Sequence, residues 1–154
     1  MIGTIRSLAR TLFADETASM AIETALVTPV LVIMTIGGFE ASSMVARQSE
    51  LQAAAAEAAA IALANPPDSY EEIQTIRDVI KASTGLSNDE VVLYRRRRCG
   101  TDSNYVIWEN ACDDGDDIST FVYIYIEDTY TPEWVNFGVG DPVTYRIRRM
   151  VQIS

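Results

Sequence analysis

A single carboxylate, that of Glu23, lies inside the longest apolar segment of the sequence. This segment runs from Ala18 to Phe39, and its other positions are apolar or weakly polar. A charged group in the hydrocarbon of a membrane costs about 2.5 kcal/mol or more, so an acid at such a position indicates a function. The first question raised by the sequence is therefore which group neutralises Glu23.

The remaining reactive side chains argue against catalysis. Histidine is absent, which removes the commonest general base and the commonest metal ligand. The formal net charge of −10 argues against nucleic-acid binding, because proteins that bind DNA or RNA need a basic surface. We therefore expect no enzyme activity, no catalytic residue, no cofactor, no metal site and no nucleic-acid partner.

Two cysteines, Cys99 and Cys112, lie far beyond the apolar segment. If that side of the chain is exported, its surroundings are oxidising and a disulfide is the expected state. Closing a loop of about 14 residues would stabilise the fold by about 3 kcal/mol. Two reduced, buried thiols are the alternative.

Three further clusters each have a structural and a binding interpretation, and we expect the structural one. The arginines from Arg95 to Arg98 would alternate between the two faces of a strand and pair with acids across it, or bind an anionic ligand. Trp108 and Trp134 would pack in the core and at edges, or form a binding face. An acidic run would be a solvated loop, or bind calcium, although its spacing matches no EF-hand. The acidic run consists of Asp113, Asp114, Asp116 and Asp117.

A long helix must carry the apolar segment. Residues 40–64 contain no glycine and no proline, and residues 53–64 hold nine alanines, the best helix formers. Pro66 and Pro67 cannot continue a helix. The sequence therefore predicts one helix over residues 19–64, about 69 Å long at ~1.5 Å per residue.

The first half of this helix is long enough to span a bilayer, which needs about 20 residues. Pro29 removes one backbone hydrogen bond within the span and predicts a helix kink there. The alanine-rich second half is expected to pack beneath its own C-terminal domain, between subunits, or both, because small side chains allow close packing.

The basic residues predict the orientation of the span. Arg6 and Arg10 precede the apolar run, whereas the nearest basic residue after it is Arg47. Basic residues near a span tend to stay in the cytoplasm, so we expect the C-terminal part to be exported. The alternatives are a buried soluble helix and a cleaved secretory signal, although the apolar run exceeds the ~7–15 residues of a signal core.

The C-terminal part predicts a short helix followed by strands. Asp68 or Ser69 can cap the helix, Gly85 can end it, and three isoleucines at positions 73, 76 and 80 share one face. Alternating patterns predict an antiparallel sheet with one wet face, which gives an α+β head on a helical stalk. The expected strands are Glu90–Arg98, Tyr105–Glu109, Thr120–Thr129 and Val143–Ile153.

The motifs of the long helix resemble a known family. Glu23–Pro29 (E-T-A-L-V-T-P), Gly37–Glu40 (G-G-F-E) and the alanine-rich helix look like the TadE-like proteins. These are minor pilins or pseudopilins of tight-adherence pili, which belong to the type IVb class. The resemblance is continuous over residues 18–64.

The end of the chain resembles the same family less continuously. Tyr130–Pro132 (Y-T-P) follows an aromatic strand, and Arg148–Met150 (R-R-M) lies in the last strand. Over residues 120–154 the resemblance is patchy, and the middle of the chain carries none.

The resemblance implies a processing step. A membrane-embedded prepilin peptidase would cut between Ala18 and Ser19, which leaves Glu23 as the fifth residue of the mature chain. Family members usually carry glycine at the position of Ala18 and often an aromatic residue at that of Thr24. The new amine on Ser19 would pair with the glutamate within or between subunits and thereby set the docking register.

The sequence therefore predicts a cytoplasmic leader over residues 1–18, a transmembrane and stalk helix over 19–64, and an exported α+β head over 65–154. We expect a minor pilin or pseudopilin that takes part in assembly of tight-adherence pili by helix packing. Its partners would be other pilin subunits, the prepilin peptidase and the inner-membrane assembly machinery. The location would be the bacterial inner membrane, crossed once, with the head periplasmic or on a pilus. The alternative is an uncleaved membrane-anchored adhesin or assembly scaffold.

Overall fold

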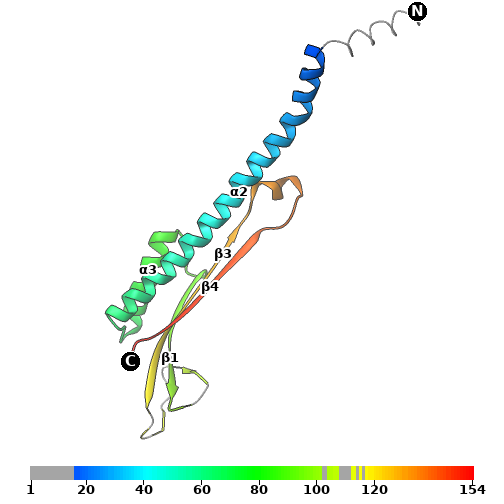
Figure 1. Ribbon diagram of the computed structural model, residues 1–154. Coiled ribbons are helices and arrows are strands. Elements are labelled where there is room, and N and C mark those ends of the chain that lie inside the picture. The colour runs from blue at the N-terminus through cyan, green and yellow to red at the C-terminus, as the bar shows by residue number, and fades with distance from the viewer. Residues whose placement is uncertain (1–15, 102–103, 108–111, 114, 116) are drawn as a thin grey trace, which may run out of the picture. The chain divides into compact units, whose positions relative to one another are not determined.

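The computed structural model describes residues 16–101, 104–107, 112–113, 115 and 117–154 (Figure 1). The chain divides between Ser43 and Met44 into two compact units. The first unit is the N-terminal part of one long helix. The second holds the rest of that helix, a second helix and a sheet. The predicted α+β class is confirmed.

The long helix α2 spans Glu16–Ala64, which confirms the prediction over residues 19–64. It continues without interruption through Pro29 and ends just before Pro66 and Pro67. Within it we distinguish a membrane segment, residues 20–43, and an alanine segment, residues 44–64. The membrane segment lies in the first unit, where all residues from 20 to 36 are exposed.

The second helix, α3, spans Tyr70–Thr84 and begins and ends as predicted. The side chain of Ser69 accepts a hydrogen bond from the backbone N–H of Glu72. The side chain of Glu72 accepts one from the backbone N–H of Ser69, so the two residues form a capping box. Gly85 ends the helix with φ at 74°, a left-handed conformation that favours glycine. The three isoleucines on its predicted apolar face are buried.

The sheet has the strand order β2-β1-β3-β4, and each neighbouring pair is antiparallel. The strand β2 begins one residue later than predicted, and residues 108 and 109 of the predicted strand lie outside the described residues. A short 3-10 helix, Glu133–Phe137, connects the last two strands. The strands are β1 (Val91–Cys99), β2 (Val106–Ile107), β3 (Ile118–Tyr130) and β4 (Val143–Gln152).

One face of the sheet packs on the alanine segment and on α3 (Figure 1). Val122, Ile124 and Ile126 of β3 have no exposed surface, which confirms the predicted alternation of that strand. The alanine segment contributes Leu51 and a row of small residues to the same core. These are Ala54, Ala55, Ala58, Ala59 and Ala62. The structure therefore shows the alanine segment packed beneath its own domain, which is one of the two expected arrangements.

The cysteine pair forms the predicted disulfide. Cys99 ends β1 and is bonded to Cys112, with Cα atoms 5.5 Å apart. The bond therefore closes the connection between β1 and β3, which contains β2. It anchors this connection where the antiparallel pairing of β1 with β3 ends, because Cys99 lies opposite Ile118.

The four consecutive arginines alternate between faces, as predicted, but the two on the face away from the helices lack the expected acid opposite them in β3. Arg95 lies opposite Val122 and Arg97 opposite Thr120, on the face that carries the helices. Arg96 and Arg98 lie on the other face, and neither is opposite an acid in β3. Arg95 donates to the carbonyl oxygen of Pro67 at 3.0 Å and also interacts electrostatically with Asp68 and Glu72. Arg96 and Arg98 lie over aromatic rings.

The acidic run and the tryptophan pair fall partly outside the described residues. Asp114 and Asp116 of the acidic run are not described, and neither is Trp108. Within the part of the chain that the structure describes, no group of acids, cysteines or histidines is arranged to hold a metal ion. Trp134 lies half-buried in the 3-10 helix.

Candidate functional site

The side chains around Glu23 form a shallow depression on the membrane segment. Its lining residues follow one another at spacings of three or four positions in two adjacent rows, which places them on one face of the helix. They are Glu23, Thr24, Val27, Thr28 and Leu31. The depression is apolar at one end and acidic at the other, so it suits a neighbouring helix that brings a positive group.

The threonines on this surface do not neutralise the acid. The hydroxyl of Thr24 donates to the carbonyl oxygen of Met20 at 2.8 Å, and that of Thr28 donates to the carbonyl oxygen of Thr24 at 2.6 Å. Thr35 bonds to its own helix in the same way, at 2.8 Å. These hydroxyl protons are used within α2, so the polar groups of the span are satisfied without the carboxylate.

Glu23 itself is exposed, and no described residue forms an ion pair or a hydrogen bond with it. Among the residues that the structure describes, one helix is long and apolar enough to cross a membrane, and it contains Glu23. In hydrocarbon the carboxylate would need a partner from another molecule or from a new chain terminus.

The predicted cleavage position lies one helical turn before the acid. Because α2 begins at Glu16, both Ala18 and Ser19 belong to its first turn. A backbone amine on Ser19 would be four residues from Glu23, and residues at this spacing are neighbours on a helix surface. Cleavage and charge pairing stay predictions.

The role of Pro29 is likewise a prediction. The residue lies within α2 and has no N–H group, so the carbonyl oxygen of Ala25 lacks the donor that a helix normally supplies. A free carbonyl at this depth weakens the helix locally, and we continue to expect a kink or loosening here.

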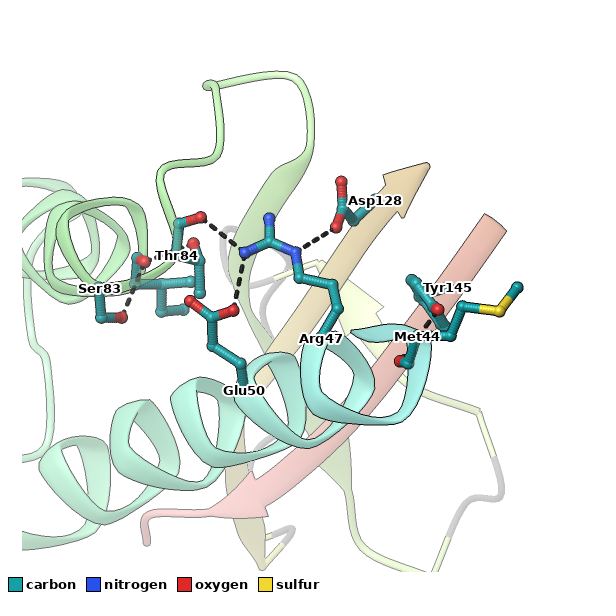
Figure 2. A network of polar contacts seen from close by, with 8 residues as sticks. Met44, Arg47, Glu50, Ser83, Thr84, Asp128 and Tyr145 are labelled. Atoms are coloured by element: carbon teal, nitrogen blue, oxygen red, sulfur yellow. Dashed lines mark hydrogen bonds and ion pairs between the residues drawn. The ribbon is translucent and has the colours of Figure 1, made fainter. Parts of the chain in front are cut away.

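A second polar site, which the sequence analysis did not identify, lies in the other unit (Figure 2). Arg47 of the alanine segment bonds to Asp128 of β3, with 2.6 Å between Nε and the carboxylate oxygen. Its Nη1 lies 3.0 Å from Glu50 and donates to the carbonyl oxygen of Thr84, also at 3.0 Å. Nearby, the hydroxyl of Tyr145 donates to the carbonyl oxygen of Met44 at 3.0 Å.

Arg47 thereby joins three elements, α2, the end of α3 and β3. A cation at the C-terminal end of a helix is favoured by the helix dipole and satisfies an otherwise unpaired carbonyl. Burial lowers the pKa of the Arg47 guanidinium, but hydrogen bonds with Asp128 and Glu50 outweigh this effect and raise the pKa above its usual value. Arg47 and its partners fix the helices on the sheet.

The spacing of Arg47 and Glu50, three residues apart on one helix, was the only local signal for this network. Asp128 lies 81 residues away in the sequence, and no pattern around it indicates Arg47. Burial of Tyr145, whose pKa is raised mainly by desolvation, is consistent with its position at the edge of the core.

Comparisons with known proteins cover only part of the chain. The family model for TadE-like proteins matches residues 18–60, which include the whole depression around Glu23 and most of the alanine segment. The resemblance found in the sequence is therefore confirmed over these residues. No curated protein and no solved structure matches the chain. The findings support a pilin-like protein associated with tight-adherence pili and anchored in a membrane by one helix.

Proposed function

We propose that this protein is a minor pilin or pseudopilin that takes part in assembly of tight-adherence pili through packing of its membrane segment. One observation carries the proposal. Glu23 lies in an apolar helix, within the residues that match the TadE-like family, and no described residue pairs with it. The carboxylate therefore favours whichever contact supplies a positive group.

The positive group would come from processing of the leader. Cleavage between Ala18 and Ser19 by a prepilin peptidase creates an amine that is positive at neutral pH. The amine and the carboxylate of Glu23 are each costly in an apolar environment, and pairing between neighbouring subunits offsets much of that cost. A wrongly docked subunit leaves both charges unpaired. The pair thus selects the docking register more than it adds stability.

The leader arginines would keep the N-terminus in the cytoplasm, with the second unit periplasmic or on the pilus. The other partners would be pilin subunits and the inner-membrane assembly machinery. The protein acts in this proposal as a structural subunit without catalysis of its own.

Mass spectrometry of the chain from membranes and from sheared fibres tests the processing step. We expect a mature chain that begins at Ser19 in both fractions. A chain that retains Met1 and never enters fibres would overturn the proposal and favour an uncleaved membrane-anchored adhesin or scaffold.

Substitution of the acid tests the pairing step. Glu23→Ala should insert into the membrane as the wild type does but be absent from sheared fibres. Glu57→Ala is a matched control, because Glu57 is an exposed glutamate in the alanine segment of the same helix. This variant should enter fibres normally. Equal recovery of Glu23→Ala and wild-type protein in fibres would contradict the pairing.

A further inference from the structure

The face of the sheet that points away from the helices is rich in arginine and aromatic residues. Leu93 and Ile124 point into the core, so their neighbours Tyr94 and Tyr123, which lie opposite each other, point outward. We call this surface the outer face. It includes Tyr94, Arg96 and Arg98 of β1, Phe121, Tyr123, Tyr125 and Glu127 of β3, and Arg146, Arg148 and Met150 of β4.

The outer face contains a hollow of about 410 Å³. Ligand pockets in proteins usually measure about 300–1,000 Å³, so the hollow has room for a compact group such as a sugar. The described residues that line the hollow are Tyr94, Arg96, Asn104, Tyr105, Tyr123 and Met150.

Aromatic rings give the hollow an apolar wall. The rings of Tyr94 and Tyr123 stack with their centroids 4.8 Å apart and an angle of 24° between their planes. The ring of Tyr105 meets that of Phe121 edge to face, at 86° and 5.2 Å. These pairs fix the tyrosines in position before a ligand binds, which lowers the entropic cost of binding.

The guanidinium of Arg96 provides the positive charge. Its central carbon lies 4.9 Å from the centroid of the Tyr94 ring. An arginine held over a ring keeps the N–H groups at its edge, where they can bind a carboxylate through two parallel hydrogen bonds. None of the described residues that line the hollow is an acid.

The charge of the outer face contrasts with that of the whole chain. Four arginines lie on it, and the carboxylate of Glu127 is already bonded to Arg146 at 3.3 Å. The chain as a whole has a net charge of −10. The positive surface therefore selects an anionic ligand, while the rest of the molecule repels one.

We propose that the hollow binds one carboxylated sugar residue of a glycan. The carboxylate accepts the two hydrogen bonds from Arg96, and the apolar C–H face of the sugar ring lies against the exposed Tyr105. Asn104 also lines the hollow, and in this proposal its amide hydrogen-bonds to a sugar hydroxyl. This inference requires neither cleavage of the leader nor assembly into a pilus.

Calorimetric titration of the full-length protein in nanodiscs tests the proposal. The probes are trigalacturonic acid and galactotriose, which differ in their carboxylates. We expect the acidic sugar to bind at least about tenfold more tightly, because a hydrogen-bonded charge pair has about that effect on affinity. Equal affinity for the two sugars would overturn the role of Arg96. An acidic hexapeptide that binds as tightly as trigalacturonic acid would assign the site to a polypeptide instead.

A matched pair of variants locates the site. Arg96→Gln should weaken binding of trigalacturonic acid at least about tenfold. Arg149→Gln removes the same charge from an exposed residue that lies opposite Ile124, on the other face of the sheet. It should leave the affinity unchanged. Equal losses in the two variants would mean that overall charge governs binding and that the hollow does not.

A third variant covers the case in which Arg96→Gln does not fold. Met150 is 42% exposed and lines the hollow, so Met150→Trp should fill the space while Arg96 remains. Circular dichroism and the melting temperature would establish that it folds. Loss of binding supports the hollow as the site, and unchanged binding overturns it.

Discussion

The two segments of α2 belong to one continuous helix, but one exposes large apolar side chains and the other buries small ones. In the membrane segment, large apolar residues are exposed, and both Leu26 and Ile33 have 70% of their surface accessible. In the alanine segment, Ala55, Ala58 and Ala62 have none accessible. Hydrophobicity alone therefore does not identify the core of this protein. The core of the second unit is built where small side chains let the helix approach the sheet closely.

The two units also differ in whether their carboxylates have partners. Asp128, with its side chain 12% exposed, is held by Arg47 within the second unit. Glu23 has no such partner among the described residues. A unit that satisfies its own charges gains stability from them, whereas an unsatisfied acid in an apolar helix makes the protein depend on a neighbour. The alanine segment therefore carries part of the fold, and the proposed function assigns contacts with other molecules to the membrane segment.

The largest expected effect comes from one substitution made in both segments. Leu51 is fully buried in the alanine segment, whereas Leu31 is 56% exposed in the membrane segment. Leu51→Ala should lower the free energy of unfolding by about 2–5 kcal/mol, because it leaves a cavity. This corresponds to a fall of roughly 10 °C in melting temperature. Leu31→Ala should leave the melting temperature of the second unit unchanged.

Thermal denaturation of the full chain in detergent, followed by near-ultraviolet circular dichroism, measures both variants. A comparable destabilisation by Leu31→Ala would mean that the membrane segment packs on the second unit. The proposed division of roles between the two segments would then be wrong.

The next largest effect is expected from substitution of the carboxylates of Asp128 and Glu23. Asp128→Asn leaves the half-buried guanidinium of Arg47 without its closest anionic partner, and we expect a loss of about 2 kcal/mol in unfolding free energy. Glu23→Gln should leave unfolding unchanged but reduce recovery in sheared fibres. Glu50→Gln is a control for the first variant. It removes a partner of Arg47 that is 46% exposed and should cost less than about 1 kcal/mol.

Chemical denaturation and fibre recovery, measured on the same three variants, separate folding from assembly. A stable Asp128→Asn variant would show that Arg47 contributes little to the fold. A destabilised Glu23→Gln variant would show that the acid acts within its own chain.

Local patterns in the sequence predicted the elements well, because each element depends on its own neighbours. The cap of α3 was expected at Asp68 or Ser69 and lies at Ser69, and the faces of β3 follow from simple alternation. The disulfide was predictable because only two cysteines are present. The resemblance around Glu23 was predictable because its motif is contiguous.

Contacts between distant elements were not predictable in the same way. The pairing of Arg47 with Asp128 depends on how α2 lies over the sheet, which no local pattern specifies. The expected acid partners of Arg96 and Arg98 were wrong because the pairing register places Phe121 and Ser119 opposite them. The hollow beside Arg96 likewise depends on the register of three strands.

A smaller effect is expected at Pro29, whose missing hydrogen bond has no counterpart in the alanine segment. Pro29→Ala supplies an N–H for the carbonyl oxygen of Ala25 and should stiffen the membrane segment. Amide hydrogen exchange of residues around position 29 should become slower, while the melting temperature of the second unit stays the same. Exchange that is equally slow in the wild type would contradict the predicted kink.

The smallest effect concerns acid titration, which should affect the second unit only. Two hydrogen bonds to Glu127 lower the pKa of its carboxyl below the usual value. The hydroxyl of Tyr125 donates the one with the larger effect, and Arg146 donates the other. A depressed pKa in the folded state stabilises the fold above the unfolded pKa of about 4.3. This stabilisation is lost as the pH falls through the folded pKa.

The melting temperature, measured from pH 6 to pH 3, should therefore fall more steeply for the wild type than for Glu127→Gln. The difference is small because this glutamate is partly exposed and solvent screens its ion pair. Glu23→Gln should follow the wild-type curve throughout, since its carboxylate lies outside the second unit. A flatter curve for Glu23→Gln would mean that the membrane segment takes part in the folding of the sheet, and that the two segments of α2 do not have separate roles.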